Sequence, residues 1–223
     1  MSSYNVYRNR SKSTGGYFPI WLGKVSPIPA GAMLDADDAK AGKFYPAGTP
    51  LALASGVASV LHGFVVTAYT TSTDDSIITV KPLFEGDAPK TTDFLQKVAA
   101  TFGTTGKAWN PDAVGANATD PEAFDITVAT ANIDVVAAGD FLAYSSADAE
   151  GGSKSLKVQP THYLYNDIAI DALGVGESDE NLKVSCALVN AHAEGILINR
   201  TPAAAVKTQM KAACPLVIQE ERY

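Results

Sequence analysis

The residues best suited to chemistry are three histidines and two cysteines, and their spacing argues against a metal or catalytic site. His62, His162 and His192 stand far apart, and none has metal-ligand spacing to another histidine, a cysteine or an acid. Cys186 precedes His192 by six positions, but a cysteine nucleophile also needs a base and an orienting group, and neither is recognisable. Cys186 and Cys214 both lie beside apolar residues, which predicts buried free thiols. The sequence therefore predicts no enzyme and no cofactor.

Two further patterns that could bind ions or phosphate are incomplete. Pairs of acids occur at Asp37 and Asp38, at Asp74 and Asp75, and at Asp179 and Glu180, but the Asp-x-Asp-x-Asp-Gly loop of a calcium site is absent. Solvated turns explain these pairs. Residues 103–107 have their glycines too close together for a phosphate-binding loop, and Ala108 stands where that loop needs Ser or Thr.

Residues 42–86 predict a pattern of strand, turn, strand, turn and strand. Pro46 and Gly48 mark the first turn, since proline fixes φ and glycine tolerates positive φ. Residues 71–76 form a polar turn, and β-branched residues flank it on both sides, which suits a half-buried pleated surface. These flanking residues are Val65, Val66, Ile77, Ile78 and Val80.

The chain then changes its hydrophobic period. Residues 90–103 predict a helix, because Phe94, Leu95, Val98, Ala99 and Phe102 share one helical face. Residues 104–123 are rich in Gly, Asn and Pro and predict a long loop. A loop of this length is either functional or wrapped on another surface. The β-pattern returns from Phe124.

A second helix is expected near the C-terminus. Thr201 is a suitable N-cap, and Pro202 is favoured just inside a helix start. The expected apolar face contains Ala203, Val206, Met210 and Ala213, and residues 216–218 predict a closing strand.

The expected fold is therefore mainly β, with small β-barrel or sandwich units and two short helices. Residues 137–139 and 162–165 follow the order of residues 29–31 and 62–65, which makes an internal duplication plausible. The predicted domains are an N-terminal arm (1–24), a first β-rich unit (25–103), a loop (104–123) and a second β-rich unit (124–223).

Charge is divided unevenly along the chain. Residues 1–34 contain Arg8, Arg10, Lys12 and Lys24 and no acid, so this segment is +4 and, with a net charge of −7, leaves −11 for the remainder. A basic arm on an acidic body can dock on an acidic surface of a partner or of a neighbouring copy. A disordered, solubilising N-terminus is the simpler alternative.

The arm also carries aromatic side chains between its basic ones. Aromatic residues with arginine are typical of interface anchors, and also of some nucleic-acid binders, but the acidic body would repel phosphates. Alternatively, Phe18 and Trp21 simply begin the first strand. The residues expected to bind a partner are Tyr4, Tyr7, Arg8, Arg10, Tyr17, Phe18 and Trp21.

The pattern of turns and β-runs resembles that of head decoration and head fibre proteins of tailed bacteriophages. Residues 46–51, Pro-Ala-Gly-Thr-Pro-Leu, match the Pro-x-Gly-Thr-Pro entry that recurs in these small β-domains, and residues 62–66 and a β-run to Gly86 follow it. Residues 194–200 and 215–218 resemble the C-terminal end of these proteins. The chain lacks heptads and Gly-x-y repeats, which makes an extended shaft doubtful.

The resemblance implies a virion structural protein that binds the outside of an icosahedral head, often as a trimer, and stabilises it or displays a host-binding surface. Its partner would be the major capsid protein, and it would be assembled in the host cytoplasm. Neither a signal peptide nor a membrane-spanning segment is recognisable. The alternative is a carbohydrate-binding or adhesive module that uses exposed tyrosines. The candidate tyrosines are Tyr45, Tyr69, Tyr144, Tyr163 and Tyr165.

Overall fold

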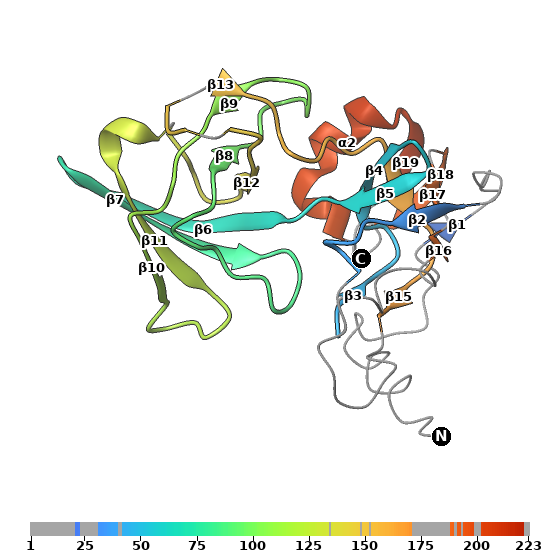
Figure 1. Ribbon diagram of the computed structural model, residues 1–223, viewed down its shortest axis with the longest axis horizontal. Helices are drawn as coiled ribbons and strands as arrows, with labels where there is room; N and C mark the ends of the chain where they lie inside the picture. Colours follow the sequence, from blue (N-terminus) through green and yellow to red (C-terminus); the bar gives the residue numbers. More distant parts are fainter. Residues whose placement is uncertain are drawn as a thin grey trace. The chain divides into compact units, whose positions relative to one another are not determined.

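The chain forms two compact units that are mainly β-structure, as the sequence predicts (Figure 1). The computed structural model describes residues 21–22, 31–39, 42–133, 135–147, 149–151, 153–170, 188–189, 191–192, 194–198 and 202–220. Unit 1 combines Met1–Leu61 with Pro160–Tyr223, and unit 2 is the continuous segment His62–Gln159. These boundaries differ from those of the predicted domains. The internal duplication stays a prediction.

Unit 2 is built on a curled, six-stranded sheet with the strand order β10-β11-β7-β6-β12-β8. Figure 1 shows its longest strands, β6 and β7, beside β11. Strands β9 and β13 form a separate two-stranded sheet, and residues Thr130–Asn132 form a 3₁₀ turn. The strands are β6 (Gly63–Thr71), β7 (Asp75–Pro82), β8 (Leu95–Lys97), β9 (Gly106–Lys107), β10 (Ala113–Ala116), β11 (Phe124–Ala129), β12 (Phe141–Tyr144) and β13 (Ser153–Lys154).

The hairpin of β6 and β7 confirms the predicted strand, polar turn and strand. Along β7, burial alternates as a period of two requires: Ile78 and Val80 are fully buried, whereas Ile77 is 45% exposed. Each fully buried aliphatic side chain stabilises the unit by about 1.5–3 kcal/mol relative to an exposed one. The core cluster of this unit consists of Phe64, Val66, Ile78, Val80, Leu95, Trp109, Ile126, Val128, Val136 and Leu142.

The predicted helix over residues 90–103 is wrong, because these residues form turns and the short strand β8. Leu95 and Trp109 exchange two backbone hydrogen bonds of 2.9 Å, and β8 pairs with β12 on its other side. Leu95 and Gln96 are adjacent and both buried, so the segment is enclosed on both faces. Pairing with distant segments overrides the local helical spacing. The predicted loop over residues 104–123 is likewise wrong in part, since it contains β9 and β10.

Unit 1 contains a second curled, six-stranded sheet, with the order β16-β2-β5-β4-β14-β17. A three-stranded sheet, β1-β18-β19, and the pair β15-β3 complete its strands. Leu51, Ala58, Val60, Tyr163 and Leu164 are almost completely buried in this unit. Its strands are β1 (Trp21–Leu22), β2 (Ala32–Leu34), β3 (Phe44–Tyr45), β4 (Pro50–Ala54), β5 (Val57–Val60), β14 (His162–Leu164), β15 (Ile168–Ala169), β16 (Leu188–Val189), β17 (Ala191–His192), β18 (Glu194–Ile198) and β19 (Leu216–Glu220).

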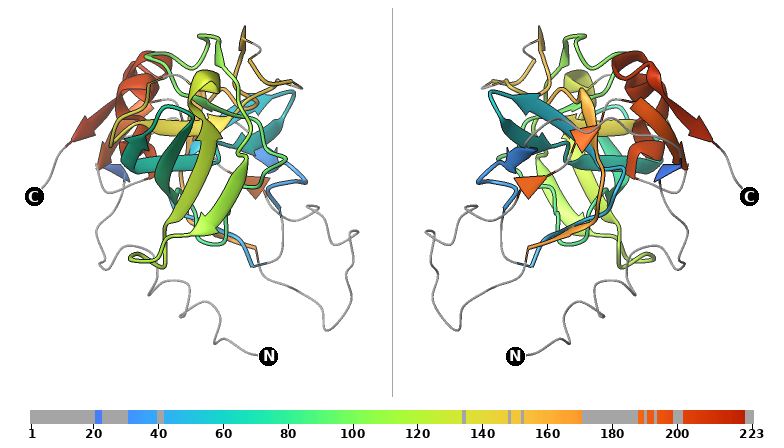
Figure 2. Two further views of the ribbon diagram at one scale, coloured as in Figure 1. Left: turned by 90° about the vertical axis from the view of Figure 1, so that its left-hand side faces the viewer. Right: turned by 90° about the vertical axis from the view of Figure 1, so that its right-hand side faces the viewer.

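The predicted C-terminal helix and closing strand are both present. A 3₁₀ turn (Pro202–Val206) leads into α2 (Lys207–Ala213), which contacts β19 (Figure 2, red). Val206 and Met210 are fully buried, as the predicted apolar face requires, but Ala213 is exposed. None of the helices among the described residues has the length and apolar character needed to cross a membrane.

Cys214 follows α2 and is a buried free thiol, as predicted, whereas Cys186 lies outside the described residues. The Sγ of Cys214 donates a hydrogen bond of 2.7 Å to the carbonyl oxygen of Thr161. Burial raises the pKa of this thiol to about 11 from 9.0. Only the thiolate reacts with alkylating agents.

We therefore expect iodoacetamide to modify Cys214 about 100-fold more slowly in the native protein than in concentrated guanidinium, at about pH 8. The reason is the two-unit rise in pKa, since at this pH the thiolate fraction falls about tenfold for each unit. Peptide mass spectrometry follows Cys214 separately from Cys186. Equal rates in the native and denatured protein would show that the thiol is accessible.

Candidate functional site

The residues predicted to bind a capsid lie almost entirely outside the described part of the chain. Tyr4, Tyr7, Arg8, Arg10, Tyr17 and Phe18 are among the residues not described. Trp21 is in β1, where its backbone lies opposite Leu197 of β18 in an antiparallel pair. Its place in a strand agrees with the alternative that Trp21 begins the first strand. The predicted role of the arm in binding stays a prediction.

The five tyrosines considered for glycan binding do not form an exposed platform. Tyr45 and Tyr163 are 1% and 0% exposed, and the hydroxyl of Tyr45 donates to the carbonyl oxygen of Asp38. Tyr69 and Tyr144 pack against the core cluster of unit 2, where Tyr144 meets Phe64 edge to face. Burial raises the pKa of Tyr144 well above its ordinary value. Tyr165 is half-buried. Four of these tyrosines, Tyr45, Tyr69, Tyr144 and Tyr163, therefore lie in the hydrophobic cores or pack against them.

The paired acids at residues 37 and 38 are not equivalent. Asp37 is exposed, but Asp38 is 7% exposed and its carboxylate accepts a 2.6 Å hydrogen bond from the backbone N–H of Val60. The prediction of a solvated turn is thus wrong for Asp38, which fastens its turn to β5. Asp74 is exposed in the turn before β7, and Asp75 is exposed at the first residue of β7. Asp179 and Glu180 lie outside the described residues.

His62 forms a pair with an acid that its sequence spacing did not indicate. Its Nδ1 lies 2.6 Å from Oδ2 of Asp87, with side chains 18% and 11% exposed, and the ring of Phe84 meets it edge to face. His162 pairs with the neighbouring Thr161 hydroxyl. Within the described ranges, no group of three His, Cys, Asp or Glu side chains is placed to hold a metal ion.

A groove of about 470 Å³ lies beside this pair, between the end of β7 and two loops of unit 2. Its apolar surface comes from Pro82, Pro121 and Phe124, and its charged side chains are Lys81, Glu85, Asp87 and Glu122. The remaining lining residues are Gly86 and Ala88. We call this hollow the β7 groove.

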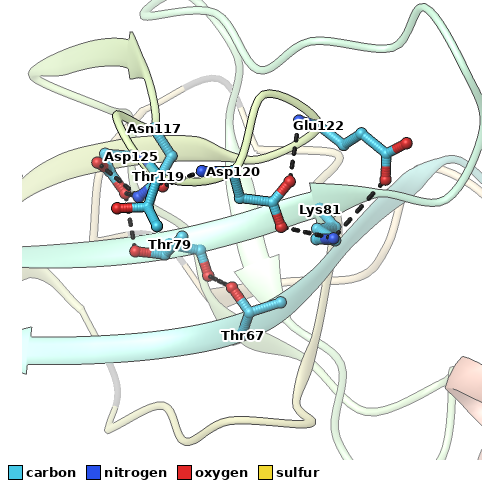
Figure 3. A network of polar contacts seen from close by, with 8 residues as sticks. All are labelled: Thr67, Thr79, Lys81, Asn117, Thr119, Asp120, Glu122 and Asp125. Carbon is cyan, nitrogen blue, oxygen red and sulfur yellow. Dashed lines mark hydrogen bonds and ion pairs between the residues drawn. The ribbon is translucent and has the colours of Figure 1, made fainter.

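Strand register brings the two walls of the β7 groove together. Phe124 of β11 lies opposite Val80 of β7, so Lys81 and the preceding loop, residues 117–122, meet at one end of the sheet. One cross-strand contact supports this register: the hydroxyl of Thr79 donates a 2.7 Å hydrogen bond to Oδ1 of Asp125. On the other side of β7, the hydroxyl of Thr67 in β6 donates a hydrogen bond to the carbonyl oxygen of Thr79 (Figure 3).

Asn117 determines the shape of the loop before β11. Its side-chain amide donates to both carboxylate oxygens of Asp125, and its Oδ1 accepts the backbone N–H groups of Thr119 and Asp120 at 2.9 Å each (Figure 3). An asparagine that accepts the N–H two residues further on forms an Asx turn, which fixes the local backbone. The backbone N–H of Glu122 then donates to Oδ1 of Asp120.

Lys81 connects this loop to β7. Its Nζ lies 2.6 Å from Oδ2 of Asp120 and 3.7 Å from Oε2 of Glu122. The hydrogen bond with Asp120 raises the pKa of Lys81, and the same bond is the main reason that the pKa of Asp120 is lowered. The pair is solvent-exposed, so it contributes little to stability. Lys81 and Glu122 both line the β7 groove.

The lining of the β7 groove carries more negative than positive charge. Three carboxylates line it against one ammonium, and that ammonium is already paired. Carboxylates accept hydrogen bonds from guanidinium, ammonium or hydroxyl groups, and Phe124 adds an apolar surface for a flat group. The chain matches no known family model, and it has no significant similarity to any curated protein or any solved structure.

Proposed function

We propose that the chain is a virion structural protein that binds the outer surface of a phage capsid. The observation that supports this most is the charge division: four basic residues and no acid in residues 1–34, joined to a remainder of −11. The arm would bind an acidic surface of the major capsid protein through Tyr4, Tyr7, Arg8, Arg10, Tyr17, Phe18 and Trp21. The β-rich units would face outward or contact sister copies, in a homotrimer, on the capsid exterior.

The pairing of β1 supports this assignment of roles. Trp21 and Leu22 lie opposite Leu197 and Ile196 in β18, and β18 in turn pairs with β19. The end of the arm is therefore tied by backbone hydrogen bonds to a sheet of unit 1. A pulling force on the arm would be resisted by the backbone hydrogen bonds of this sheet, as attachment to a capsid requires.

The test is co-sedimentation with phage heads of the full-length protein and two charge-matched variants. We expect R8E/R10E to lower the affinity for heads at least tenfold, because two charge-assisted contacts would become repulsive, at a cost of about 1.4 kcal/mol or more. The control K90E/K157E changes the net charge equally at two exposed positions and should bind as the wild type does. Equal binding by both variants would refute the role of the arm, and a wild-type protein that never pellets with heads would refute the function.

A second candidate function is carbohydrate binding, and the β7 groove is the observation that favours it. Carboxylates beside an aromatic ring can accept hydrogen bonds from sugar hydroxyls while the ring contacts the apolar face of the sugar. The site would then contain Glu85, Glu122 and Phe124 instead of the tyrosines. A glycan array without any bound sugar would exclude this candidate.

A further inference from the structure

Strand β19 of unit 1 exposes two large aliphatic side chains next to each other on one side. Leu216 and Ile218 are 67% and 60% exposed, whereas Val217 between them is only 3% exposed. The exposed side of a half-buried strand is normally polar, so this alternation of buried and exposed apolar residues indicates a contact surface. Within the described part of the chain, β19 also stands at the end of its sheet, where it pairs with β18 alone. We call Leu216 and Ile218 the β19 patch.

A second exposed apolar surface of unit 1 crosses three neighbouring strands of its six-stranded sheet. Met33 of β2 lies opposite Val57 of β5, and Val57 lies opposite Ala54 of β4. Met33 and Val57 are 48% and 38% exposed, and Ala54 is exposed as well. The next pair along the ladder, Leu34 and Ala58, is buried, so the sheet has an apolar inner face and an apolar outer stripe. We call Met33, Ala54 and Val57 the sheet patch.

Neither patch offers a counter-charge to a charged partner. Strands β2, β4 and β5 contain no charged residue, and β19 contains none before Glu220. A charged group placed against such a surface would lose its hydration without gaining a partner, so an apolar, uncharged surface fits each patch best. Nucleic acid and strongly charged peptides therefore fit neither. Each of the two patches has the chemistry that the other needs.

Two unlike apolar patches on one chain suit a contact between unlike surfaces of two copies, which closes into a ring when the rotation between copies allows it. In such a ring both patches of every copy are covered, and burial of apolar surface favours that arrangement. A two-fold contact between like patches would leave the other patch exposed. We propose that the β19 patch of one copy binds the sheet patch of the next copy. That the ring contains three copies rests on the proposed function, but the contact itself does not.

The experiment is the mass of the full-length protein in solution, measured by light scattering over a range of concentrations without phage heads. V57E and I218K each place a charge in one patch, and V57E/I218K combines the two changes. The controls are I77K and I77E, because Ile77 is an exposed strand residue of unit 2 outside both patches, at 45% exposure. A thermal unfolding curve checks that each variant is folded.

We expect the wild type and both controls to form the same oligomer. V57E and I218K should each need a concentration about tenfold higher or more for assembly, because a lone charge would be buried against an apolar surface. V57E/I218K should recover assembly, since the introduced carboxylate of one copy would meet the introduced ammonium of the next. Sodium chloride at about 0.5 M should weaken the double variant more than the wild type, because salt screens charge pairs.

A wild-type protein that stays monomeric at every concentration would overturn the inference, and so would single variants that assemble as the controls do. Loss of assembly in I218K with none in V57E would identify a two-fold contact through the β19 patch and would overturn it equally. A double variant that assembles no better than the single variants would refute the pairing of patch with patch. Binding to heads does not enter these measurements, so their failure is distinct from failure of the proposed function in co-sedimentation.

Discussion

Replacing Gly63 by alanine is expected to lower the free energy of unfolding by about 3 kcal/mol or more, because the site has no room for a methyl group. Gly63 begins β6, is buried and lies opposite Ala143 of β12. A Cβ at this position would collide with the carbonyl oxygen of Leu142 and would lie 2.6 Å from the ring of Phe141. The first of these atoms is backbone, so β6 and β12 would have to separate.

Urea unfolding followed by circular dichroism measures this effect, and Gly115 provides the matched control. Gly115 lies in the edge strand β10, where an added Cβ would meet no atom within 4 Å. Alanine there should be neutral or stabilise the protein by up to about 1 kcal/mol, since it restricts the unfolded chain. If G63A and G115A unfolded at the same urea concentration, the close packing of β6 on β12 would be incorrect.

Replacing Asp38 by alanine is expected to cost about 2–3 kcal/mol, although Asp38 stands in a turn. The substitution leaves the buried N–H of Val60 without its acceptor, and an unsatisfied buried donor costs its full desolvation energy. D38N should be milder, because an amide oxygen can still accept this hydrogen bond. The neighbouring D37A should change stability by less than about 0.5 kcal/mol, since Asp37 is exposed.

The same unfolding measurement separates these variants. The expected order of stability is wild type and D37A, then D38N, then D38A. A protein in which D37A and D38A are equally stable would contradict the buried role of Asp38.

The β-hairpin of unit 2 could be predicted from sequence because its signals are local. The β-branched residues Val65, Val66, Ile77, Ile78 and Val80 flank a polar turn, and along β7 burial alternates with a period of two. The helix predicted over residues 90–103 failed because helical spacing and a short buried strand can share one pattern. Leu95 became a strand residue through Trp109 and β12, which lie far along the chain.

The β7 groove could not be predicted, because its parts are distant in sequence. Lys81 and Asp120 meet only because β11 pairs with β7 in the register that places Phe124 opposite Val80. The pair of His62 and Asp87 depends in the same way on the path of the chain after β7. Spacing rules detect ligands that share one helix or loop, and neither site has that form. The unusual content of residues 104–123 was the only local sign that this loop has a special role.

The division of unit 1 between the two ends of the chain has a consequence for synthesis on the ribosome. Unit 2 is complete once Gln159 has emerged, so its sheet can form while translation continues. Trp21 must wait for Leu197, and β18 for β19, before the sheet of unit 1 can close. At about 5–20 residues per second, the segment from Pro160 to the end of β19 takes roughly 3–12 seconds to be made. During that interval the nascent chain carries a finished unit 2 and a unit 1 whose sheet cannot yet close, which is when a chaperone would be needed most.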